Sequence, residues 1–236
     1  MSDRAERQRE FMERWEACIP ATSPAWEQKR RLATAMRRVI SHLVQSNAPE
    51  SELHQAAEAM ERYSERLASH PTLRRAGRDS QSPATPEEIT FVDQSPFAGL
   101  ANPLAPPIRL EEDDAWAVVG YVTYGAAYEG PPACVHGGHV AAAFDEVLGF
   151  VQGMSGAPGF TGELTIRFRS PTPLHRRLRI RGEIVRVEGR KIFAEGTLHA
   201  HEQLCAEAEG LFITPNPEQY QRMLRARDER FDAQGG

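Results

Sequence analysis

The most constraining feature of the sequence is a helix-length stretch, His139 to Gln152, that is apolar on almost every side. It reads HVAAAFDEVLGFVQ, and apolar residues occupy positions on all faces of the helix that it predicts. A helix that is hydrophobic all round packs in the interior of a protein. This stretch therefore predicts a central, buried helix around which other parts of the chain are arranged.

The segments on both sides of this helix have the alternating pattern of β-strands. In residues 160–169, for example, leucine, isoleucine and phenylalanine alternate with threonine and arginine. Turns around 187–190 and 201–203 are short, so the strands that they join are antiparallel neighbours. The prediction is an α+β fold in which one antiparallel sheet wraps around one central helix. The predicted strands cover residues 115–124, 160–169, 178–184, 190–200 and 203–213.

The chain outside this unit divides by composition. Residues 32–44 and 53–67 have helical apolar spacing, and the short break between them predicts an antiparallel pair. Two helices alone cannot bury both apolar stripes, so we expect them to pack on the rest of the chain or on a second copy. The pair is either a stabilising extension or a specific recognition element. The predicted organisation is a helical extension over 1–80, a Pro-rich extended segment over 81–110, the sheet-and-helix domain over 111–215 and a C-terminal helix over 216–236.

Composition excludes several classes of function. The 236 residues carry a net charge of -5, which offers no electrostatic footprint for nucleic acid. No apolar run reaches the roughly 18 residues of a membrane-spanning helix. The chain has three cysteines and no apolar core of a secretory signal near its N-terminus. We therefore expect a cytoplasmic protein without a membrane span.

Two features of the central helix predict a functional site. Asp145 is a carboxylate in an otherwise apolar helix, where burial without a partner would cost several kcal/mol, so it is either solvated or functional. Gly137 and Gly138 follow His136 at the start of the helix. Glycine there allows close approach to the backbone, and the free N–H groups of the first turn can bind an anion or a developing oxyanion. The alternative is a tight turn that requires glycine.

The spacing of these residues predicts a homodimer if they act on one substrate. Gly137 and Asp145 are eight positions apart, which is roughly 12 Å along a helix axis. One reacting carbonyl cannot contact both groups of the same chain. The carboxylate would then come from a second chain whose helix runs antiparallel to the first, and a two-fold dimer would hold two equivalent sites.

The motifs resemble those of the hotdog-fold acyl-CoA thioesterases of the phenylacetate-pathway type. The resemblance covers residues 115–214 and is carried by HGGHVAAAFD (136–145), FTGELTIRFRSPTPL (160–174), a Gly-Arg turn at 189–190 and CAEAEGLF (205–212). It implies a homodimer, often a dimer of dimers, that hydrolyses the thioester of an acyl-CoA. Coenzyme A is then part of the substrate, and no other cofactor is implied.

The resemblance also implies roles for individual residues. The Gly137 N–H would polarise the thioester carbonyl, and Asp145 of the opposing chain would act as general base on water or as nucleophile. Thr161 would help to hold the attacking water, and His136 would orient the loop. Some members have Asn or Gln six residues before the histidine, where this chain has Gly130; either Gly137 then works alone or Glu129 shapes that side.

Other assignments are predictions of substrate contacts. Coenzyme A carries phosphates, and Arg190 and Lys191 are the candidates to bind them near the mouth of the site. Gly138 and Glu129 are assigned to the substrate-binding loop. The Pro-rich segment is a candidate lid over the acyl pocket. No metal is expected, because the HxxH and HxH pairs lack further ligands at metal spacing. The alternatives to a thioesterase are a non-catalytic acyl-CoA-binding or regulatory protein of this fold and a hydratase on a related fold.

Overall fold

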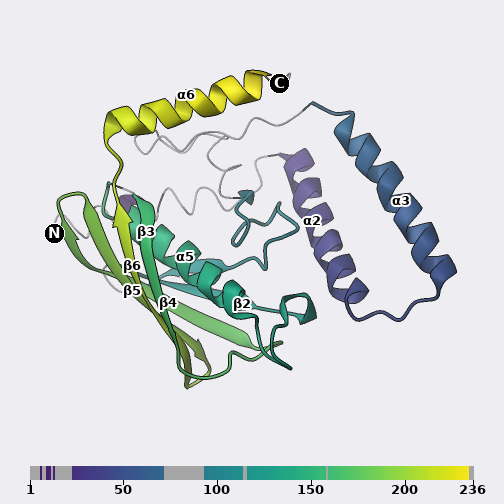
Figure 1. Ribbon diagram of the computed structural model, residues 1–236, viewed down its shortest axis with the longest axis horizontal. Coiled ribbons are helices and arrows are strands. Elements are labelled where there is room, and N and C mark those ends of the chain that lie inside the picture. Colours follow the sequence, from purple (N-terminus) through teal and green to yellow (C-terminus); the bar gives the residue numbers. More distant parts are fainter. Residues whose placement is uncertain are drawn as a thin grey trace.

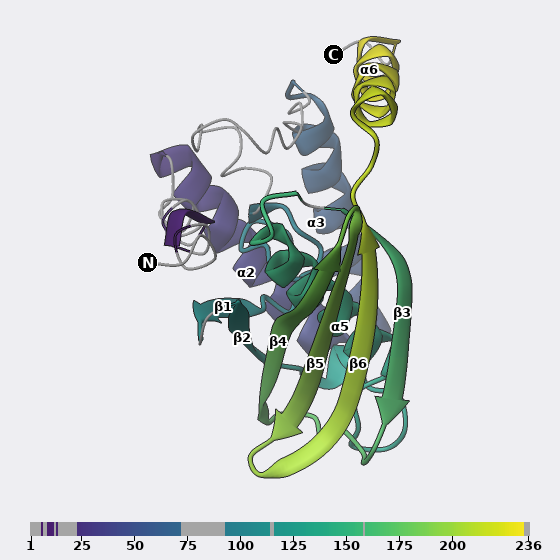
Figure 2. The same ribbon diagram turned by 90° about the vertical axis from the view of Figure 1, so that its left-hand side faces the viewer.

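The computed structural model describes residues 6, 9–11, 13, 23–71, 93–113, 116–157 and 159–233. Its centre is a six-stranded antiparallel sheet in the order β1-β2-β4-β5-β6-β3 (Figure 2). The strands are β1 (Arg109–Glu112), β2 (Ala117–Thr123), β3 (Phe160–Phe168), β4 (Arg177–Glu188), β5 (Lys191–Ala200) and β6 (Gln203–Ile213).

The sheet curves around helix α5 (Gly137–Gly153), which lies against its inner face (Figure 1). Phe144, Val147 and Leu148 of this helix are completely buried. Three central strands present glycine to the helix: a Cβ atom at Gly182 or Gly196 would lie only 3.0 or 3.2 Å from a methyl carbon of Leu148, and one at Gly210 only 3.3 Å. Because these glycines have no side chain, α5 packs close to the sheet. This close packing sets the position of the polar residues of α5 relative to the strands.

This arrangement is the hotdog fold that the sequence predicted, in the α+β class. The predicted strands after the helix and the turns between them are confirmed: Gly189, at φ +58°, begins the two-residue connection from β4 to β5. One strand was missed. β1 has only four residues, with Leu110 alone buried, and it lies at the end of the predicted Pro-rich segment, where no alternation marks it. Its pairing with β2 is therefore a tertiary feature.

The face of α5 opposite the sheet is covered by the N-terminal half of the chain. Ser95 donates a hydrogen bond of 2.6 Å to the Glu146 carboxylate of α5, and Phe11 contacts Phe150 edge to face, with ring centroids 4.9 Å apart. Ala105 and Ile108 of the same Pro-rich stretch are buried. Residues 93–108 form a series of turns that lies over α5, whereas the sequence predicted an extended segment; residues 81–92 fall outside the described residues.

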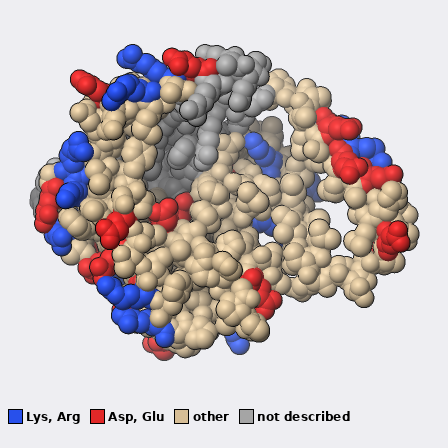
Figure 3. Space-filling view, viewed as in Figure 1, with Lys and Arg blue, Asp and Glu red and all other residues tan. Residues whose placement is uncertain are grey.

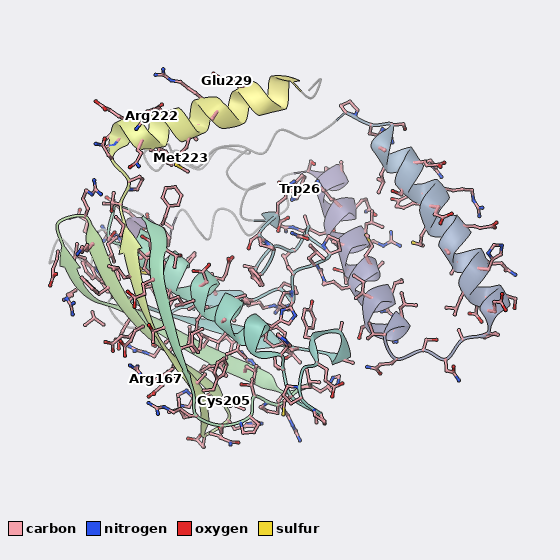
Figure 4. All side chains as sticks on the ribbon, viewed as in Figure 1. Trp26, Arg167, Cys205, Arg222, Met223 and Glu229 are labelled. Atoms are coloured by element: carbon pink, nitrogen blue, oxygen red, sulfur yellow. The ribbon has the colours of Figure 1, made fainter. Side chains whose placement is uncertain are left out.

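Helix α2 (Pro24–Leu43) is attached to this covering segment through one buried carboxylate. Asp93 accepts hydrogen bonds from Trp26 Nε1 at 2.5 Å and Arg30 Nε at 2.7 Å, and its other oxygen accepts the Leu100 N–H at 3.2 Å. Trp26 lies at the start of α2 (Figure 4). Further along the helix, Arg37 donates to the Asn102 carbonyl at 2.8 Å. Polar contacts therefore hold α2 in place as much as apolar ones do.

Two further helices extend from the main body. Helix α3 (Glu50–Ala68) runs back in the opposite direction to α2 but is separated from it along its length, and it has no buried residue (Figure 1). Helix α6 (Pro217–Ala233) begins where the sequence predicted, with Asn216 Oδ1 accepting the Glu218 N–H at 3.0 Å. Among the described residues, no helix combines the length and apolar character needed to cross a bilayer.

Candidate active site

The N-terminus of α5 offers one free backbone donor. His136 is the N-cap: its Nδ1 accepts the Gly138 N–H at 3.0 Å, and its carbonyl accepts the N–H groups of His139 and Val140. Gly137 is the first helical residue, and its N–H has no partner within the described part of the chain. Free N–H groups at this end combine with the positive end of the helix dipole to favour negative charge. Gly137, rather than Gly138, is therefore the donor available to a ligand.

The loop before α5 is shaped by close backbone packing. A Cβ atom at Gly130 would lie 2.7 Å from the Cα of His136, so no larger residue fits there without a shift of the loop. The Glu129 carboxylate accepts the Ala133 N–H at 2.6 Å, which stabilises a turn in which Ala133 has a φ of +60°. Glu129 thus orders the loop that leads into the helix.

Asp145 emerges from α5 on its exposed side. In the single chain it is exposed, so the desolvation cost that applies to a buried carboxylate does not arise. The hydroxyl of Thr161 on β3 donates a hydrogen bond of 2.8 Å to Asp145 Oδ1, and this leaves Oδ2 open. The structure therefore brings together the predicted pair of Asp145 and Thr161.

Both halves of the predicted site lie along β3, at opposite ends. Thr161, near the start of the strand, contacts Asp145, whereas Phe168, its last residue, lies against Gly137: a Cβ atom on Gly137 would be 3.3 Å from the Phe168 ring. β3 is the outermost strand, none of its nine residues is buried, and its outer edge has no partner strand in the described chain (Figure 2). The two halves therefore face the free edge of the sheet.

Arg190 lies in the turn between β4 and β5, Lys191 is the first residue of β5, and both are exposed. Lys191 is in register with Ile213, which is in register with Phe160 at the start of β3. The two cations are thus at the Asp145 end of the sheet, two strands away from Thr161. Glu129 and Gly138 are at the Gly137 end.

Aromatic and histidine side chains cluster behind the helix N-terminus. The Tyr128 ring contacts the His139 ring edge to face, with centroids 4.9 Å apart, and Tyr124 lies 5.2 Å from Tyr128. Burial, with a smaller contribution from His136, lowers the pKa of His139. Burial raises the pKa of Tyr124 and Tyr128. The cluster is therefore uncharged at neutral pH and provides an apolar support for the first turn.

Phe168 is the site residue that the sequence analysis did not single out. The alternation of β3 grouped it with Leu164 and Ile166, which predicts a core residue. In the structure it is 58% exposed, because it lies at the edge strand beyond the reach of the core. The sequence signal that could have identified Phe168 is a large aromatic residue at the end of a strand, in a chain whose buried helix begins with two glycines.

Comparisons with known proteins show which family the chain belongs to. The family model described as "Thioesterase superfamily" matches residues 134–206. The crystal structure of protein RHA08564, described as a thioesterase superfamily protein, is 32% identical to the chain, with a TM-score of 0.71. The alignment covers 82% of this chain and 97% of that one. This chain belongs to the thioesterase superfamily.

Curated members of the superfamily match a shorter stretch. The acyl-coenzyme A thioesterase THEM4 of Bos taurus is 34% identical over 96 residues, which are 40% of this chain and 39% of the relative. The acyl-coenzyme A thioesterase THEM5 of Homo sapiens is 31% identical over 91 residues, which are 38% and 37% of the two chains. The chain therefore matches about two fifths of the length of these curated relatives. Among the described residues of this superfamily member, no group of three or more His, Cys, Asp or Glu residues is placed to hold a metal ion.

Proposed function

We propose that the protein hydrolyses the thioester of an acyl-CoA to a free acid and coenzyme A. The observation that carries the proposal is the free Gly137 N–H at one end of β3 and the Asp145–Thr161 pair at the other, both facing the unpaired edge. One group suits an oxyanion, and the other suits a proton transfer or a nucleophilic attack. The names of the curated relatives, acyl-coenzyme A thioesterases, support the same substrate class.

The site is proposed to form between two chains. Antiparallel pairing of two β3 strands about their midpoint, near Leu164, would bring Thr161 of one chain beside the Phe168 end of the other. Asp145 of the partner subunit would then approach Gly137 across the interface. Each isologous dimer would contain two such sites, which agrees with the separation of roughly 12 Å between the two groups in one chain.

The proposed chemistry uses only the side chains and backbone of the protein. The thioester carbonyl oxygen accepts the Gly137 N–H, and Asp145 removes a proton from water held with the help of Thr161. The resulting hydroxide adds to the carbonyl carbon, and the tetrahedral oxyanion collapses with cleavage of the C–S bond. The thiolate of coenzyme A leaves and takes up the proton. Alternatively, Asp145 attacks the carbon directly, and water hydrolyses the resulting anhydride.

The remaining assignments are parts of the same proposal. Arg190 and Lys191, exposed at the Asp145 end, would bind phosphates of coenzyme A, and Glu129 and Gly138 would shape the loop at the carbonyl end. No cofactor besides the coenzyme A of the substrate is invoked. A reducing, cytoplasmic location is supported by the free thiols of Cys134 and Cys205.

The role of Asp145 is tested by release of free thiol from a panel of acyl-CoAs. We expect Asp145→Asn to reduce hydrolysis to the uncatalysed rate while acyl-CoA binding is retained. Glu202→Gln, at an exposed carboxylate in the turn between β5 and β6, is the matched control and should be fully active. Tight binding without hydrolysis by the wild-type protein would favour the non-catalytic alternative, and full activity of Asp145→Asn would contradict the mechanism.

The Gly137 donor can be removed without breaking the helix. Proline is well tolerated at the first helical position, and His136, at φ -58° and ψ 132°, already has the extended conformation that a following proline requires. Gly137→Pro should lower kcat roughly 100-fold or more, the usual effect of losing one oxyanion donor. Gly137→Ala keeps the N–H and also fills space near Phe168, so equal losses in both variants would show that crowding, rather than the donor, matters.

The shared site is tested by mixing two inactive variants. A dimer of one Asp145→Asn chain and one Gly137→Pro chain has one intact site and one site with both defects. Unfolding and refolding an equimolar mixture should therefore restore about a quarter of wild-type activity. A mixture as inactive as its components would contradict a site formed between subunits.

A further inference from the structure

Helix α2 has two distinct faces, and only one of them is buried against other described residues. Trp26 and Ala33 are buried on the face that contacts the covering segment, together with the hydrogen-bonded Arg30 and Arg37. A second face carries large apolar side chains that are exposed in the described chain, except for the half-buried Leu32, and Leu43 among them is 58% exposed. This stripe consists of Leu32, Met36, Val39, Ile40 and Leu43.

Helix α3 presents a similar stripe along its whole length. Leu53, Met60 and Leu67 are each 43% exposed or more, and no residue of this 19-residue helix is buried in the described chain. An amphipathic helix in a protein gains most of its stability by packing its apolar face rather than from helix propensity. The positions 53, 57, 60, 64 and 67 in α3, and 32, 36, 39 and 43 in α2, have the alternating three- and four-residue spacing of helix–helix seams.

The two helices have opposite charges. α2 contains five Lys and Arg residues against one glutamate, a net charge of +4, whereas α3 contains five glutamates against two arginines, a net charge of -3. Acidic side chains accordingly gather along α3 in the space-filling view, which also shows open space between α2 and α3 (Figure 3). Electrostatics therefore favours contacts between α2 and α3 and disfavours contacts between like helices.

We propose that the α2–α3 pair is an interface with a second copy of this chain, and that the two pairs form an antiparallel four-helix bundle. In such a bundle each helix has only neighbours of opposite charge, because the two α2 helices lie diagonally across the core, as do the two α3 helices. Both stripes then become buried, which a two-helix pair cannot achieve.

The proposal does not rest on the proposed enzyme activity, and its interface is separate from the β3 edge. α2 and α3 lie on the far side of α5 from the sheet, whereas β3 is at the edge of the sheet (Figures 1 and 2). Pairing through both surfaces, with perpendicular two-fold axes that intersect, would generate a closed assembly of four chains. Loss of the helical interface should therefore halve the assembled mass, whether or not the β3 edges also pair.

The first test compares the solution mass of two matched variants by light scattering. Leu53→Glu/Met60→Glu places two carboxylates in the α3 stripe, and Gln55→Glu/Ala59→Glu adds the same charge on the opposite side of the helix. Because no side chain of α3 is buried within the chain, neither variant should disturb the sheet domain. We expect the stripe variant to have half the wild-type mass and the control to keep it. Equal masses for wild type and both variants would overturn the proposal.

The second test determines whether α2 of one chain contacts α3 of the other chain. Val39→Cys and Met60→Cys chains, of different length through a purification tag, are mixed, refolded together and oxidised. A covalent heterodimer, absent when wild-type chains are treated in the same way, is the expected result. A Val39→Cys/Met60→Cys chain that closes a disulfide within itself, with no cross-link between chains, would show that α2 and α3 simply fold onto each other and would overturn the proposal.

Discussion

Thr161 and Asp145 show how much one hydrogen bond should contribute to the proposed reaction. The hydroxyl orients one carboxylate oxygen and leaves the other for the water. A hydrogen bond to a charged group contributes about 1.5–3 kcal/mol, and the exposure of this pair in the single chain favours the lower end. Thr161→Val should therefore lower kcat about tenfold with little change in KM, and Thr161→Ser should restore most of it. Equal rates for the valine and serine variants would exclude this role for the hydroxyl.

His139 makes a specific prediction about pH and stability. Its pKa is lowered in the folded protein by burial and by His136, so below the ordinary value of 6.5 the unfolded chain binds more protons at this residue than the folded chain does. The His139 contribution to stability is thus present above about pH 6.5 and is lost as the pH falls through the range below it. Urea unfolding between about pH 5 and pH 7.5 should show a smaller decline for His139→Gln than for wild type. An identical slope for His139→Gln and wild type would contradict the prediction.

At the scale of single residues, the sequence singles out candidates where local chemistry is unusual. An acidic residue in an apolar helix and two glycines after a histidine are visible in the chain itself, and the structure places each beside the free edge of β3. The exposure of Phe168 could not be predicted from the sequence, because Phe168 occupies the same position in the alternating pattern of β3 as residues that face the core. Its environment depends on which strand lies beside β3.

At the scale of elements, the packing of helix α2 on the covering segment depends on Asp93, which accepts hydrogen bonds from Trp26 and Arg30 of that helix. Asp93→Asn would leave Arg30 facing a neutral group in a largely buried position, which should weaken the docking of α2 by about 2–3 kcal/mol after allowance for the partial exposure of Arg30. Hydrogen exchange should then become faster in α2 while α5 keeps its protection. Glu27→Gln, in the exposed first turn of the same helix, is the control. Unchanged exchange in Asp93→Asn would mean that apolar contacts alone hold the helix.

The elements predicted from the sequence pattern are strands whose two faces differ and a helix that is apolar on all faces. β4, β5 and β6 alternate between the core and solvent, and α5 is apolar throughout, so each was recognisable without knowledge of its neighbours. β1 was missed because a four-residue strand contains too few alternations to be distinguished. The order in which strands pair, with β3 beside β6 rather than β4, has no counterpart in local pattern.

For the whole molecule, the proposed intersubunit site predicts an activity that depends on protein concentration. Dilution that separates β3-paired chains would part Gly137 from Asp145 of the partner subunit, so the specific activity should fall together with the dimer fraction. Thiol release is measured over a dilution series, with the mass at each concentration determined by mass photometry. Full activity at concentrations where only single chains are detected would refute the shared site.

The chain's own order of residues determined the α+β class, the central helix, most of the strands and the candidate groups Gly137 and Asp145, because side-chain periodicity and glycine placement act over a few neighbouring positions. Only the tertiary structure decided that Thr161 reaches Asp145, that His136 leaves Gly137 as the free donor, that β3 is an open edge and that Asp93 ties α2 to the covering segment. The physical reason is that these contacts join segments distant in sequence. Their formation depends on how closely α5 packs on the sheet, which no local pattern encodes.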